Sequence, residues 1–163
     1  MDSFKMQVLD IMKKDCRVSL ENMAAMLDRD TKAVASAIDE LESEGILVGY
    51  QPVINWDKTD RKTTEGVIEV KCVPQLGRGF DALASAICLF DEVKSVYLMS
   101  GSYDILVRVE ADSLRDLAMF VSEKLSALET VTATSTSFIF KRYKQNGVCL
   151  ASAQQSDRIA MTE

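Results

Sequence analysis

Hydrophobic positions in the first fifty residues recur with the period of an α-helix, in three separate runs. Within each run they fall three or four residues apart, which predicts three amphipathic helices. Ser19 and Asp30 are predicted to cap the second and third helices, and Gly45 to end the third. Residues 46–50 are then predicted to leave as a strand. The three runs are Phe4, Val8, Ile11 and Met12; Leu20, Met23, Ala24 and Leu27; and Val34, Ala37, Ile38 and Leu41.

The second and third predicted helices are separated by a short polar break at residues 28–30. Two short helices joined by such a turn are typical of a helix-turn-helix, and a strand after the third helix favours its winged form. A plain three-helix bundle has the same apolar spacing and is the alternative. The turn length and the trailing strand lead us to prefer the winged helix-turn-helix.

From residue 66 onward, the two-residue period of strands alternates with the longer period of helices. Strand patterns occur near residues 66–72, 93–99, 103–110 and 131–140, and helical patterns near 80–87 and 114–125. The order is therefore βαββαβ, which predicts a ferredoxin-like domain with two helices on one face of an antiparallel sheet. The fold class expected for the whole chain is α+β. Its expected parts are the helix-turn-helix (1–50), a linker (51–65), the ferredoxin-like domain (66–144) and a C-terminal tail (145–163).

Residues 93–110 contain two β-rich runs that meet at Gly101-Ser102. This pattern predicts a hairpin whose tight turn needs positive φ at Gly101. The first run is apolar on both faces, with Val96 and Leu98 on one and Tyr97 and Met99 on the other. The domain's own helices cover one face only, so we expect a second copy of the chain to cover the other in a two-fold dimer.

Composition narrows the possible chemistry. The 163 residues are 47% hydrophobic and 27% charged, which is typical of a globular protein. The chain has no histidine, and its four cysteines form no Cys-x-x-Cys pair, so we expect no metal and no cofactor. It also lacks a nucleophile elbow, a phosphate loop and a dinucleotide fingerprint, so no catalytic residue is expected. With no membrane-spanning run and no signal peptide pattern, we expect a cytoplasmic protein with no membrane partner.

Charge is distributed unevenly between the two halves. Residues 1–60 carry 7 Lys and Arg against 12 Asp and Glu, and the remaining residues carry 12 against 13. The predicted helix-turn-helix is therefore the acidic half. Because cations neutralising phosphates supply most non-specific affinity for DNA, this balance predicts weak non-specific binding.

Two motifs resemble the Lrp/AsnC family of bacterial and archaeal transcriptional regulators. The first covers residues 18–27, 34–38 and 41–46, and the second is the strand that runs into Gly101-Ser-Tyr-Asp104. The resemblance extends from about residue 4 to residue 144. It implies a regulator of double-stranded DNA that responds to an amino acid and whose dimers assemble further, commonly into octamers. Ser36 and Ala37 depart from the family, which commonly has arginines there.

The resemblance also implies two groups of functional residues. A carboxylate would be received by backbone N–H groups at the Gly101 turn, and an ammonium by Asp104 or a hydroxyl. Asp104 has the alternative role of binding the turn's own amides, and the threonines that of favouring a strand. The DNA-binding candidates are Ser19, Arg29, Thr31, Lys32, Ala33 and Ser36, and the effector candidates are Ser100, Gly101, Tyr103, Asp104, Thr134 and Thr136.

Two other functions are consistent with the same predicted two-domain arrangement. The acidic first half suggests a ligand-binding or interaction protein that has lost DNA binding. Haem-pathway decarboxylases share the two-domain arrangement, but they usually carry histidines in the second domain and this chain has none.

Overall fold

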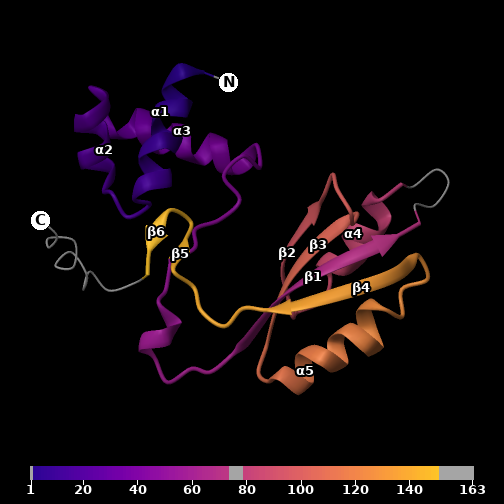
Figure 1. The fold of residues 1–163 in the computed structure, drawn as a ribbon. Helices are drawn as coiled ribbons and strands as arrows, with labels where there is room; N and C mark the ends of the chain where they lie inside the picture. The colour runs from indigo at the N-terminus through magenta and orange to yellow at the C-terminus, as the bar shows by residue number, and fades with distance from the viewer. Residues whose placement is uncertain (1, 74–78, 151–163) are drawn as a thin grey trace, which may run out of the picture. The chain divides into compact units, whose positions relative to one another are not determined.

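The computed structural model describes residues 2–73 and 79–150, and the chain divides into two compact units, Met1–Pro52 and Val53–Glu163 (Figure 1). Unit 1 is helical. Its core is formed by Val8 and Met12 of the first helix together with apolar side chains of the other two. The helices are α1 (Ser3–Lys14), α2 (Leu20–Leu27) and α3 (Thr31–Ser43), and α2 and α3 form the helix-turn-helix.

The predicted capping residues of unit 1 are confirmed. Ser19 Oγ accepts a hydrogen bond from the backbone N–H of Asn22 at 3.2 Å. Asp30 Oδ1 accepts one from the N–H of Ala33 at 2.7 Å. Gly45 follows α3 with φ of 67°, a left-handed conformation that a glycine adopts without steric cost. These contacts satisfy backbone groups that have no partner inside the helix.

The predicted wing is wrong. Residues 46–50 form turn and irregular backbone, and residues 2–52 contain no strand. The amides of Ile46 and Leu47 both donate to the carbonyl of Leu41 at 3.0 Å, so they close the end of α3 and do not enter a strand pair. A strand also needs a neighbour, and the described part of unit 1 supplies none.

Unit 2 has the predicted βαββαβ order and a four-stranded antiparallel sheet in the order β2-β3-β1-β4. Both helices pack on one face of the sheet and share a core with Ile68, Val70 and Val107. The mixed α+β class and the ferredoxin-like topology are therefore confirmed. The elements are β1 (Thr64–Cys72), α4 (Asp81–Cys88), β2 (Val93–Leu98), β3 (Ile105–Ala111), α5 (Leu114–Met119) and β4 (Val131–Phe138).

The second helix of unit 2 departs from the predicted apolar stripe. A π-helical turn, η2 (Phe120–Leu125), continues α5. Its wider turn shifts the phase after Met119, so Phe120 and Leu125 are buried together with Leu117 of α5. Leu114, in the first turn of α5, is 55% exposed. An α-helical period extended through residue 125 cannot anticipate that shift.

The predicted tight turn at Gly101 is also wrong. β2 ends at Leu98 and β3 begins at Ile105, so the chain reverses through a longer loop. The positive-φ glycines of the described residues are Gly45, Gly79 and Gly147, and Gly101 is not among them. Spreading the reversal over residues 99–104 removes the need for a left-handed residue. We call these residues the effector loop, after the effector candidates Ser100, Gly101, Tyr103 and Asp104 that they contain.

The segments on either side of the sheet are tied together within unit 2. A short 3-10 helix, η1 (Trp56–Lys58), lies before β1, and a hairpin of β5 (Lys144–Gln145) and β6 (Val148–Cys149) follows β4. Asn55 Nδ2 donates to the Leu150 carbonyl at 3.0 Å. Among the described residues, no helix is long and apolar enough to cross a membrane.

Candidate DNA interface and effector loop

Five of the six DNA-binding candidates lie in the turn between α2 and α3 or in the first two turns of α3, and Ser19 lies at the start of α2. They are not equally available. The hydroxyl oxygen of Ser19 already accepts a hydrogen bond as the N-cap of α2. The guanidinium of Arg29 lies 5.7 Å from the centre of the Phe4 ring, and Ala33 is half-buried. The exposed candidates on α3 itself are Thr31, Lys32 and Ser36.

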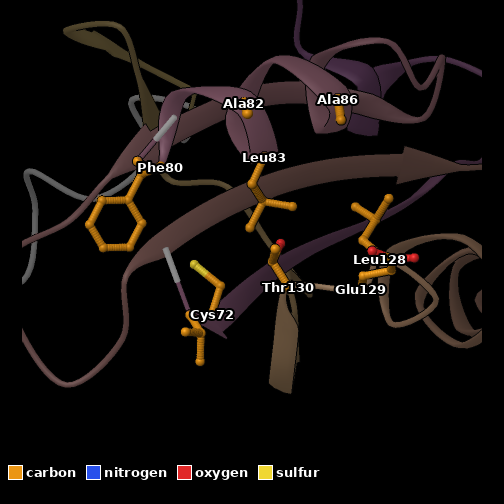
Figure 2. A pocket seen from close by; sticks show the side chains of 10 residues that line it. Cys72, Phe80, Ala82, Leu83, Ala86, Leu128, Glu129 and Thr130 are labelled. Carbon is orange, nitrogen blue, oxygen red and sulfur yellow. The ribbon is translucent and has the colours of Figure 1, made fainter. Parts of the chain in front are cut away.

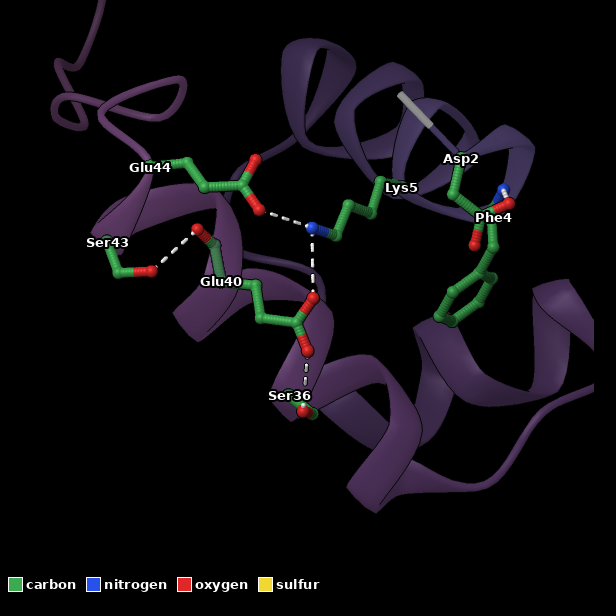
Figure 3. A network of polar contacts seen from close by, with 7 residues as sticks. All are labelled: Asp2, Phe4, Lys5, Ser36, Glu40, Ser43 and Glu44. Atoms are coloured by element: carbon green, nitrogen blue, oxygen red, sulfur yellow. Dashed lines mark hydrogen bonds and ion pairs between the residues drawn. The ribbon is translucent and has the colours of Figure 1, made fainter.

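A polar network links α1 to the exposed side of α3 (Figure 3). Lys5 Nζ lies 2.9 Å from Glu40 Oε2 and 2.7 Å from Glu44 Oε1. Hydrogen bonding to these two carboxylates raises the pKa of Lys5, and the bond from Lys5 lowers the pKa of Glu40. Ser36 Oγ lies 3.2 Å from Glu40 Oε1.

A second contact occupies another carboxylate of α3. The Tyr50 hydroxyl donates to Glu42 Oε1 at 2.7 Å, and this bond raises the pKa of Tyr50 to about 12. Four acidic residues lie near the end of α3, and three of them, Glu40, Glu42 and Glu44, therefore have partners inside unit 1; the fourth is Asp39. The acidity seen in the sequence is partly compensated by local contacts, while Lys5 is no longer available to a phosphate.

In the effector loop, the structure gives Asp104 a specific partner. Asp104 Oδ2 accepts from the N–H of Cys72 at 2.8 Å, and the N–H of Asp104 donates to the Val70 carbonyl at 3.0 Å. Both partners lie at the end of β1. Asp104 therefore anchors the loop to the neighbouring strand, whereas the alternative considered from the sequence had it binding amides of its own turn.

The tip of the loop leaves backbone donors unused. In the part of the chain that the structure describes, none of the N–H groups of residues 100–103 donates a hydrogen bond. A Cβ built on Gly101 would meet no atom within 4 Å. Ser100 and Gly101 are exposed and Tyr103 is half-buried. The loop thus presents open amides beside a residue that has no side chain.

The two threonine candidates lie on β4, across β1 from the loop. Thr134 pairs with Val70 and Thr136 with Ile68, both of which are buried. Directly opposed residues share a face, so both threonines lie on the helix-covered face of the sheet. Thr134 Oγ1 is 3.4 Å from Ser126 Oγ. Asp104 and Thr134 therefore flank Val70 from opposite sides, and Thr136 lies further along the strand.

A cavity of about 210 Å³ opens next to the anchored end of the loop (Figure 2). It lies between α4 and the ends of β1 and β4 and includes Cys72, whose amide binds Asp104. Burial raises the pKa of the Cys72 thiol, and the nearby Asp104 carboxylate adds to this effect. Sequence reasoning missed this cavity because its walls come from three separate segments. Its lining residues include Cys72, Phe80, Leu83, Ala86, Leu128 and Thr130.

A buried carboxylate in unit 2 was also missed. Glu65 is 8% exposed; it forms an ion pair with Arg142, and its Oε2 lies 3.8 Å from Arg108 Nη2. Glu65 borders a pocket of about 300 Å³ together with Trp56 and Arg61, whose guanidinium lies 4.8 Å from the Trp56 ring. The sequence pattern places Glu65 at the end of the predicted linker 51–65, and it gives no sign of this burial because the covering segment after β4 lies far away in the sequence.

Known proteins share both units of this chain. Residues 65–149 match the family model described as the Lrp/AsnC ligand binding domain. The chain is 40% identical over 157 residues to the uncharacterized HTH-type transcriptional regulator YugG of Bacillus subtilis (strain 168), with 96% of this chain and 95% of that protein covered. It is 28% identical over 137 residues to the HTH-type transcriptional regulator LrpA of Pyrococcus abyssi, with 84% and 94% covered.

Two solved structures have the same fold. A transcriptional regulator from Neisseria meningitidis, determined as a complex with L-Met, has a TM-score of 0.68 and 18% identity, with 89% of this chain and 93% of that chain covered. The leucine response regulatory protein LrpA of Mycobacterium tuberculosis has a TM-score of 0.73 and 21% identity, with 93% and 100% covered.

Proposed function

Since the chain belongs to the Lrp/AsnC family of transcriptional regulators, we propose that it binds double-stranded DNA through α3 and responds to an amino acid held at the effector loop. The unused amides of residues 100–103 carry the second half of this proposal. Successive backbone N–H groups without partners of their own can form an anion site that suits a carboxylate. The open space at Gly101 lets a ligand approach the backbone closely.

The proposed ligand site combines the loop with its surroundings. Ser100, Gly101 and Tyr103 would receive the carboxylate, and the negative charge of Asp104 would attract the ammonium while its Oδ2 stays on Cys72. Thr134 and Thr136 complete the candidate set from β4. An L-Met complex of a protein with this fold supports an amino acid as the chemical class.

The proposed DNA interface rests on the exposed residues of the recognition helix. Thr31, Lys32 and Ser36 lie in the first two turns of α3, which are the turns that reach base edges in helix-turn-helix proteins. Arg29 and Ser19 lie near the start of α3 and of α2, and Ala33 is the remaining candidate. Because Lys5 is paired with two carboxylates, Lys32 and Arg29 supply the positive charge of the candidate set.

We also propose that the chain self-associates through the sheet face that its helices leave uncovered. Tyr97 is 49% exposed on that face and lies beside Leu106 in the strand register. An uncovered sheet with apolar side chains is a frequent association surface. The dimer would assemble further, with octamers plausible for the family, and the protein would act in the cytoplasm, where it meets DNA.

The deciding experiment is a fluorescence anisotropy titration of fragments from the source genome with the full chain, with and without each of the twenty amino acids. We expect salt-dependent binding whose affinity changes several-fold with at least one amino acid. Lys32→Ala should weaken binding across all sequences and lower the salt slope by about one, because one phosphate contact is lost.

Lys94→Ala is the matched control, since Lys94 is an exposed lysine of unit 2. It should leave the titration unchanged. Binding of no fragment at low salt would overturn the DNA-binding proposal and favour the alternative of a ligand-binding protein that has lost DNA binding. DNA binding that no amino acid alters would overturn the effector proposal alone.

A further inference from the structure

Ser36 makes a hydrogen bond that constrains what its hydroxyl can recognise. It lies in the second turn of α3 and is exposed, on the same stripe of the helix as Lys32 and Glu40. Its Oγ is 3.2 Å from Glu40 Oε1, one turn further along the helix (Figure 3). A free serine hydroxyl both donates and accepts, so a fixed partner changes its recognition properties.

The direction of this hydrogen bond follows from the state of Glu40. Lys5 Nζ lies 2.9 Å from the other oxygen of the same carboxylate, and its side chain is only 16% exposed. This contact lowers the pKa of Glu40, so the carboxylate is ionised at neutral pH. An ionised carboxylate has no proton to donate. Ser36 is therefore the donor, and its single hydroxyl proton is already used.

We propose that Ser36 is a specificity-determining residue that reads an exocyclic amine in the major groove, N6 of adenine or N4 of cytosine, with Glu40 and Lys5 as positioning residues. A hydroxyl whose proton is committed offers only lone pairs to the DNA. Those lone pairs match the amine donors of adenine and cytosine and oppose O6 of guanine and O4 of thymine, which are acceptors. This inference rests on the proposed DNA binding.

The neighbouring positions do not share this constraint. The described residues provide no side-chain acceptor for Thr31, so its hydroxyl remains free to donate or accept. Lys32 carries only donors and suits phosphates or guanine. A preference for an amine-bearing base that Ser36→Ala abolishes therefore identifies Ser36 rather than its neighbours.

To test this, the full chain is mixed with a pool of randomised DNA duplexes, and the bound fraction is recovered and sequenced. For the wild type we expect one position in each half-site at which adenine or cytosine is enriched about fivefold over guanine or thymine, as one hydrogen bond allows. Ser36→Ala should abolish that enrichment. Glu40→Gln should reduce it below about twofold while DNA binding persists, because the amide can donate to Ser36 and release its proton.

Glu42→Gln is the matched control. It makes the same carboxylate-to-amide change on the same helix, but Glu42 binds Tyr50 rather than Ser36. It should raise overall affinity as Glu40→Gln does and keep the base preference. A selected site whose base preferences all survive Ser36→Ala, or all survive Glu40→Gln, would overturn the inference and leave the proposed function standing. Recovery of no DNA by the wild type would overturn both.

Discussion

At the scale of single residues, the loop motif Gly-Ser-Tyr-Asp contains two residues with different jobs. Gly101 has neither positive φ nor a close neighbour, so nothing in the described residues 2–73 and 79–150 requires a glycine there. Asp104, in contrast, satisfies the amide of Cys72 at 2.8 Å. We infer that Gly101 gives a ligand access to the backbone, and that the first role of Asp104 is to stabilise the fold.

Substitutions at these two positions should therefore have opposite signatures. Gly101→Ala should leave the free energy of unfolding within about 0.5 kcal/mol of the wild type, because the new methyl group meets no atom. It should nevertheless abolish the melting-temperature shift that an amino acid produces. Asp104→Ala should lower the free energy of unfolding by about 1–3 kcal/mol, since it leaves the Cys72 N–H unpaired.

Asp104→Asn separates charge from hydrogen bonding, because its amide oxygen can still accept from Cys72. Denaturant unfolding measures the free energy of unfolding of each variant, and thermal shift with each amino acid measures its response to ligand. A Gly101→Ala protein that responds to ligand as the wild type does would contradict a ligand role for this glycine.

Residue-level predictions from the sequence succeeded where the partner is local. Ser19 and Asp30 bind amides three positions ahead, so a pattern of a few letters contains the whole interaction. The partner of Asp104 lies 32 positions away and depends on strand register. The neighbours of Glu65 depend on a segment that returns over the sheet after β4. Such contacts have no local signal.

At the scale of elements, the recognition helix combines a strong cap with an unfavourable charge. Asp30 binds the Ala33 amide at 2.7 Å and places a carboxylate at the N-terminus of α3. A negative charge there stabilises the helix but repels a phosphate. The same side chain therefore affects stability and DNA affinity in opposite directions.

Asp30→Ser should uncouple these effects. Serine caps nearly as well as aspartate, so we expect a loss of less than about 0.5 kcal/mol in the free energy of unfolding and a several-fold gain in DNA affinity at low salt. Asp30→Ala removes the charge and the cap together, and should cost about 1 kcal/mol. Urea unfolding and anisotropy titration measure the two effects, and equal DNA affinity for Asp30→Ser and the wild type would count against this interface.

The order of the main helices and strands followed from periodicity, whereas the strand predicted at residues 46–50 does not form and the short elements η1, β5 and β6 were not predicted. The apolar run of residues 46–48 reads as a strand, but its amides close α3 instead. The π-helical turn at Phe120–Leu125 shifts the buried stripe. In both cases tertiary packing decides between local conformations that the sequence pattern alone leaves equally acceptable.

At the scale of the whole molecule, the uncovered sheet face is the main candidate for assembly. Leu106 and Tyr97 lie side by side on it, next to Glu69 in the register of β1 and β3. Leu106→Arg should convert the self-associated protein into monomers in sedimentation velocity, because it places a long charged side chain at the centre of the apolar surface, where its burial is costly. Far-UV circular dichroism should stay unchanged, since the substitution does not reach the helix-covered core.

Leu89→Arg is the control for that substitution. Leu89 is 84% exposed and follows α4, away from the uncovered sheet face. It should keep the wild-type sedimentation profile. A wild-type protein that sediments as a monomer at all concentrations would contradict assembly through this face.

The hydrogen bond between Asn55 and Leu150 has a practical consequence for the design of chimeric proteins. Because Asn55 binds the residue after the C-terminal hairpin, and Glu65 binds Arg142, the segment from Val53 onward is part of the body of unit 2. A chimera that grafts a foreign DNA-binding module onto this sensor should therefore be spliced ahead of Val53. A splice placed at the start of β1 would discard Asn55 and remove its hydrogen bond to Leu150, the residue after the C-terminal hairpin.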